Sequence, residues 1–158
     1  NQGMQPIAGY NFGAREFQRV DRVLKLTIFC ATAIMTLGFL VAELFPRQLV
    51  MIFTTDEELI QHSVSGMRIV FMMFPIIGFQ MVTSNFFQSV GMAGKAIFLS
   101  LTRQLLFLLP SLLILPHFFQ TNGIWMSMPV ADALSSIVSF FMLYSQIKKF
   151  KTADQYGN

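Results

Sequence analysis

The sequence predicts an all-α integral membrane protein. First, 54% of its 158 residues are hydrophobic and 12% are charged, whereas about 25% of an average soluble domain is charged. Second, four apolar stretches each approach the roughly 20 residues that an α-helix needs to cross the hydrocarbon core. Third, most Lys and Arg residues lie in the segments before, between and after these stretches, and four spans would place most of them on one side of the membrane. We therefore expect four complete transmembrane helices, preceded by the end of another helix.

The opening segment is polar and rich in glycine. Residues 1–14 are too polar to span a membrane alone, and we interpret them as the cytoplasmic end of an upstream helix. Residues 15–25 carry Arg15, Arg19, Arg22 and Lys25 and are expected to form a cytoplasmic loop. Because the chain starts with Asn and no signal peptide precedes its first apolar stretch, we interpret it as part of a longer chain.

The first predicted span covers residues 26–45 and ends before Pro46. Its lone cysteine, Cys30, lies within the apolar run, so no disulfide framework is expected. Residues 46–65 are interpreted as an extracytoplasmic segment that leads into the next helix. Within it, Thr55 and Glu58 have the spacing of a capping box, which predicts Thr55 as the N-cap.

The second predicted span covers residues 66–90. Pro75 has no backbone N–H, so it leaves the carbonyl of Phe71 free and predicts a kink. A polar stripe follows at helical spacing, with one amide beside it: Gln80, Ser84 and Gln88, then Asn85. Polar side chains within a span usually face protein or water. Either interhelical hydrogen bonds or a transport pathway would account for them.

The third predicted span covers residues 96–116. Arg103 lies about two turns from its start, close enough for its side chain to reach the membrane surface. Arg103 is therefore expected to be a cytoplasmic anchor, with a gating contact as the alternative, and Arg19 is grouped with it. Pro110 predicts a second helix kink.

The fourth predicted span covers residues 124–147, and residues 148–158 are expected to form a cytoplasmic tail. Pro129 predicts a third kink. Asp132 lies about eight residues, or roughly 12 Å, inside this span, and Ser136 follows on its face. An ionised carboxylate is costly within a bilayer, so Asp132 is a candidate for carrying a proton or meeting a cationic substrate. A structural partnership with a freed carbonyl near Pro129 or with Arg103 is the alternative.

The distribution of cations gives the orientation. With four spans, one side of the membrane receives nine of the 11 Lys and Arg residues: Arg15, Arg19, Arg22, Lys25, Lys95, Arg103, Lys148, Lys149 and Lys151. The other side receives Arg47 and Arg68. This bias predicts that the opening segment and the C-terminus are cytoplasmic.

Several short motifs, in order along nearly the whole chain, resemble the MATE (multidrug and toxic compound extrusion) family, and most closely its bacterial drug/cation antiporter branch. The opening carries the signature residues Gln5, Pro6, Gly9, Tyr10, Asn11 and Gly13, followed by Arg19-Val20. Later elements are Phe53-Thr54-x-Asp56, Phe87-Gln88-x-x-Gly91, Arg103-Gln104 with Pro110, and Gly123-Ile124-Trp125-x-x-x-Pro129-x-x-Asp132.

This resemblance implies part of a six-helix lobe in a twelve-helix, two-lobe transporter. It implies secondary active efflux of amphipathic or cationic drug-like compounds, in exchange for protons or sodium, by alternating access. It also implies a multi-pass protein of the bacterial inner (plasma) membrane that needs no cofactor. The N-terminal lobe, which lies outside this sequence, would be its main partner.

The residues exclude several other functions. No nucleophile triad, phosphate-binding loop, metal motif or nucleic-acid patch is recognisable, so we expect neither an enzyme nor a metal or nucleic-acid site. A flippase for lipid-linked precursors remains an alternative, but it would need a strongly cationic cavity. A non-transporting membrane subunit is the other alternative. The 18 Phe and 11 Met residues fit either an adaptable drug-binding wall or a lipid-facing surface.

Overall fold

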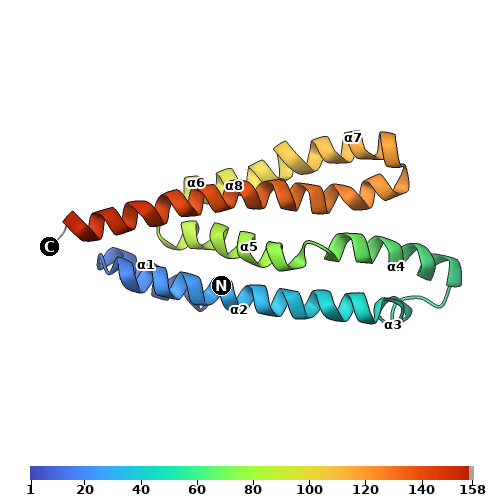
Figure 1. The fold of residues 1–158 in the computed structure, drawn as a ribbon, viewed down its shortest axis with the longest axis horizontal. Helices are drawn as coiled ribbons and strands as arrows, with labels where there is room; N and C mark the ends of the chain where they lie inside the picture. The colour runs from blue at the N-terminus through green and yellow to red at the C-terminus, as the bar shows by residue number, and fades with distance from the viewer. Residues whose placement is uncertain (157–158) are drawn as a thin grey trace.

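The computed structural model describes residues 1–156, which are helical except for short connections (Figure 1). The chain order is α1 (Met4–Gly13), α2 (Phe17–Leu44), α3 (Pro46–Met51), α4 (Glu57–Phe71), α5 (Phe74–Ser89), α6 (Ala93–Leu101), a π-helical segment η1 (Thr102–Leu108), α7 (Leu109–Phe119) and α8 (Thr121–Tyr156). No strand occurs among these residues. The predicted all-α class is therefore confirmed.

The long helices form an elongated bundle (Figure 1). α2 packs on α5, α5 packs on α8, and α8 packs on α7 and η1. The short helix α1 lies beside the start of α2 and also contacts α5. It lies at the same end of the bundle as the end of α8, whereas α3 lies at the opposite end. The start of α2 and the end of α8, which carry most of the Lys and Arg residues, thus lie at the same end of the bundle.

Three helical stretches of the described chain are long and apolar enough to cross a membrane: Phe17–Leu44, Ala93–Phe119 and Thr121–Tyr156. The pair Glu57–Phe71 and Phe74–Ser89 meets the same test jointly but is bent by 50°. The number of spans is three, or four if the bent pair counts as one. Only 6% of the most apolar 18-residue stretch of α2 is buried, so most of this stretch is available to lipid or to further helices.

The prolines lie where the helices depart from regular geometry. The bend between α4 and α5 falls at Met72 and Met73, and Pro75 is the second residue of α5. The π-helical segment η1 ends two residues before Pro110. A proline that leaves a carbonyl without its usual partner is a known cause of both. Pro129 lies inside α8, which continues through it to Tyr156.

Three boundary expectations were wrong. The segment 15–25 is mostly helical, because α2 begins at Phe17 and no Gly or Pro interrupts it. The break between α1 and α2 covers residues 14–16, and within it Arg15 has a φ of +59°. The segment 148–156 is also helical and extends α8, while residues 157–158 lie outside the described part. The N-cap of α4 is Asp56 and not Thr55, since the Asp56 carboxylate accepts hydrogen bonds from the N–H groups of Glu58 and Leu59.

The hydrophobic core lies at the end of the bundle that carries most of the cations. Val20 and Leu24 of α2 pack with Phe86 and Phe87 of α5, and Phe150 of α8 completes the cluster. Phe150 stacks on Phe17, with ring centroids 5.1 Å apart. Burial of this ring explains why the end of α8 is ordered against the bundle despite its three lysines.

Candidate functional site

A buried ion pair joins two helices in the apolar part of the bundle. Asp132 of α8 is only 2% exposed, and Nε of Arg103 donates to its Oδ1 at 2.6 Å. The Arg103 side chain comes from η1 and is 35% exposed. An unpaired carboxylate at this depth would be strongly destabilising. The pair therefore keeps Asp132 compensated and fixes the direction of the guanidinium.

A groove of about 300 Å³ lies between α5 and the α6–η1 helix. It is lined by Ile77, Gln80, Met81, Ser84, Asn85, Leu99, Ser100, Arg103 and Gln104. Three of the four polar residues singled out in the second predicted span thus share one hollow with Arg103. Asp132 does not line it and lies behind Arg103. The groove combines one cation with amide, hydroxyl and apolar groups.

Polar contacts continue from the groove into the contact between α5 and α8. Gln80 is buried, and its Nε2 donates to Oγ of Ser135 on α8 at 2.5 Å. The Oε1 atom of Gln80 and the Oγ atoms of Ser136 and Ser139 are buried without a hydrogen-bond partner among residues 1–156. Buried polar atoms in native proteins are usually paired. These three oxygens therefore retain capacity to accept a further donor.

The opening helix contacts α5 beside the groove. Nε2 of Gln5 donates to Oδ1 of Asn85 at 3.5 Å. A side chain in place of Gly9 would put its Cβ 2.9 Å from the carbonyl oxygen of Ser89, so this contact needs a glycine. The buried Asn11 donates to the carbonyl of Ile7 within α1. Three signature residues thus have structural explanations.

Other predicted residues lie away from the groove. Gln88 is exposed and does not line it. Arg19 is exposed and lies 3.8 Å from a carboxylate oxygen of Glu16, which is a weak surface contact. Ser136 is buried in α8. The remaining signature residues, Pro6, Tyr10 and Gly13, are exposed.

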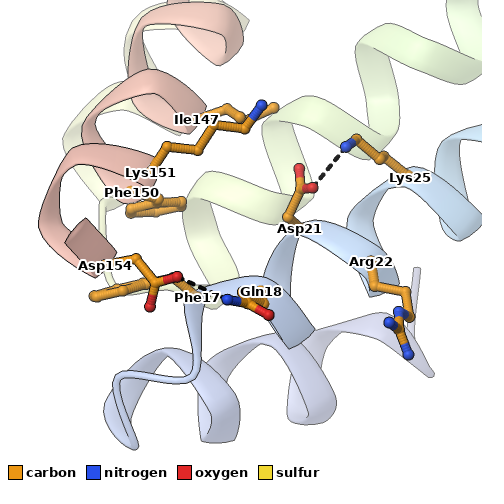
Figure 2. A pocket seen from close by; sticks show the side chains of 9 residues that line it. All are labelled: Phe17, Gln18, Asp21, Arg22, Lys25, Ile147, Phe150, Lys151 and Asp154. Atoms are coloured by element: carbon orange, nitrogen blue, oxygen red, sulfur yellow. Dashed lines mark hydrogen bonds and ion pairs between the residues drawn. The ribbon is translucent and has the colours of Figure 1, made fainter. Parts of the chain in front are cut away.

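A second hollow, of about 390 Å³, lies between the start of α2 and the end of α8 (Figure 2). Its two carboxylates already have partners. Lys25 pairs with Asp21 at 2.6 Å, and Gln18 donates to Asp154 at 2.9 Å. Sequence reasoning missed this contact because the segment after Ile147 was treated as a tail. The one apolar residue among its lysines, Phe150, was the available indication.

Comparisons with known proteins agree on one family. The model of the MatE family matches residues 1–113. Two curated relatives, the multidrug export proteins MepA of Staphylococcus aureus strains MSSA476 and MW2, are each 20% identical over 143 residues, which is 90% of this chain. The chain spans about a third of the length of these relatives (31%).

Several solved structures share the fold of nearly the whole of this chain. A chain described as protein A is 43% identical, with a TM-score of 0.85, over 91% of this chain and 32% of its own length. A multidrug resistance MATE transporter matches in its inward-facing conformation with a TM-score of 0.87, over 94% of this chain and 35% of that chain. An outward-facing conformation matches with a TM-score of 0.86, over 94% of this chain and 34% of that chain. Both are 22% identical, which establishes a shared fold.

Proposed function

Because this chain belongs to the MatE family, whose members are transporters and not enzymes, we propose that it forms most of the C-terminal lobe of a secondary active multidrug efflux transporter. The predicted family is thereby confirmed. The observation that carries the proposal is the groove between α5 and η1, where Gln80, Ser84, Asn85 and Arg103 meet inside an apolar bundle. Such polar groups within a membrane usually mark a pathway.

The proposed architecture is two six-helix lobes, with this chain supplying four spans and the end of a fifth helix. The fraction of the relatives that the chain covers, about a third, supports this division. We propose alternating access by rocking of one lobe against the other. The fold fits inward- and outward-facing relatives about equally well, as expected if this part moves as a rigid body.

Efflux of amphipathic or cationic compounds, coupled to protons or sodium, is the proposed activity. Gln80, Ser84, Asn85, Gln88, Ser136 and Asp132 are the proposed pathway residues, with Arg103 and Arg19 as gating or anchoring residues. A flippase for lipid-linked precursors is less well supported. It would need several cations within the membrane, whereas Arg103 is the one cationic residue among the described residues that line the groove.

The proposed location is the bacterial inner membrane, with the C-terminus in the cytoplasm. Lys148, Lys149 and Lys151 lie on the end of α8, at the same end of the bundle as the start of α2 with Arg19 and Arg22 (Figure 1). Positively charged segments are retained on the cytoplasmic side. The opposite end carries Arg47 and Arg68.

The test uses the complete protein, produced in a bacterium that lacks its own drug pumps. Ethidium accumulation is measured with and without a protonophore and with and without a sodium gradient. Lower accumulation that one of these treatments abolishes supports the proposal and identifies the coupling ion. We expect Asp132→Asn to weaken efflux at an unchanged protein level, while Gln48→Ala, at an exposed position of α3 at the other end of the bundle, gives the size of effect outside the groove. No gradient-dependent efflux of any tested dye would favour the non-transporting subunit.

A further inference from the structure

We infer that Arg103 binds an anionic group of the transported compound, so that among amphipathic compounds the groove favours those that carry a carboxylate. This inference rests on the proposed function and narrows its substrate class. Asp132 contacts only the Nε side of the Arg103 guanidinium. The Nε atom donates to Asp132, and the two Nη atoms make no hydrogen bond to residues 1–156.

The free edge of Arg103 belongs to the groove. Arg103 is one of the residues that line it, and 35% of its side chain is exposed, whereas Asp132 is 2% exposed and absent from the lining. A guanidinium presents its N–H groups in a planar fork that matches the two oxygens of a carboxylate. Asp132 therefore acts as a positioning residue that holds the fork in place.

The remaining lining supplies no competing charge. Its other polar residues are neutral amides and hydroxyls: Gln80, Ser84, Asn85, Ser100 and Gln104. Its apolar residues are Ile77, Met81 and Leu99. No carboxylate lines the groove, so a compound that is only cationic has no ionic partner there. A carboxylate attached to an apolar body would match both kinds of lining.

The backbone around Arg103 also fits a ligand-binding role. Arg103 lies in the π-helical segment Thr102–Leu108, and π-helical turns occur frequently at functional sites. Arg103 lines the groove together with Gln80, Ser84 and Asn85 of α5. A bound compound would thus contact α5, α6 and η1 together.

The experiment compares a rhodamine dye that carries a free carboxylate with its methyl ester. The two dyes share one ring system and differ by the ester methyl group, which removes the negative charge that Arg103 would recognise. Uptake is measured in everted membrane vesicles that contain the complete transporter. The main variant is Arg103→Gln combined with Asp132→Asn, because it removes both charges and leaves no unpaired carboxylate. Arg103→Lys keeps the charge without the fork, and Arg47→Gln, an exposed residue paired with Glu57 at the other end, is the control.

We expect the double variant to transport the free acid about tenfold more slowly, the size of effect typical for a lost hydrogen bond to a charged group. Transport of the ester should fall less, only as far as in the single variant Asp132→Asn, and Arg103→Lys should lose part of the acid transport. Equal losses for both dyes would mean that Arg103 is structural, which overturns the inference and leaves the proposed function standing. Transport of the ester but not the acid by the unmodified protein would also overturn it. Transport of neither dye nor ethidium would refute both.

Discussion

Breaking the Arg103–Asp132 pair should destabilise the protein, and restoring neutrality should recover much of the loss. Arg103→Met removes the partner of a carboxylate that is 2% exposed. Losing one member of a fully buried pair costs about 3–5 kcal/mol. Because 35% of the Arg103 side chain is exposed, water screens this pair in part, and we expect about 2 kcal/mol.

Asp132→Asn removes the opposite charge, and the double variant Arg103→Met/Asp132→Asn removes both. The double variant should be more stable than the sum of the single effects predicts, with a coupling of about 2 kcal/mol. The assay is thermal unfolding of the complete, detergent-solubilised protein, in which size-exclusion chromatography measures the fraction that remains folded after heating. A loss of 2 kcal/mol should lower the midpoint by about 4 °C if the lobe unfolds as a unit. Strictly additive single effects would refute the reasoning, since they would mean that the two charges do not stabilise each other.

Three further predictions concern the packing and the groove. Gly123→Ala should lower the unfolding midpoint by several degrees, because its Cβ would overlap the backbone oxygen of Leu115 in α7, whereas Gly38→Ala, with no atom within 4 Å, should be neutral. Equal midpoints would contradict the tight α7–α8 contact. Phe150→Ala should lower the free energy of unfolding by about 3 kcal/mol, because it opens the aromatic cluster, whereas Phe141→Ala at an exposed position should lower it far less. Limited proteolysis of the C-terminal end of α8 compares the two variants, and equal cleavage would argue against the cluster. Gln80→Ala should slow ethidium efflux several-fold at an unchanged protein level, and unaltered efflux would exclude its amide from the pathway.

The features that the sequence predicted correctly depend on local properties. Apolar stretches near the length of a bilayer predicted the long helices, and the family followed from motifs spread along the chain. The departures from regular helix next to Pro75 and Pro110 follow from the missing N–H of proline. Boundaries were less predictable: Phe17–Lys25 and Lys148–Tyr156 are helical although their charges suggested a loop and a tail. Whether a charged segment continues a helix depends on what its few apolar residues can pack against.

By itself, then, the sequence determined that the chain is helical, membrane-embedded and related to the MATE transporters, because length, hydropathy and motifs are properties of contiguous residues. Only the tertiary structure decided which polar groups meet. Arg103 and Asp132 are 29 residues apart, and Gln80 and Ser135 are 55 apart, yet each pair is in hydrogen-bond contact. Gln80 is buried while Gln88, two turns later on the same predicted stripe, is exposed. Such differences depend on the rotation of each helix about its axis and on which neighbour covers it. Helical periodicity alone gives neither the rotation nor the neighbour.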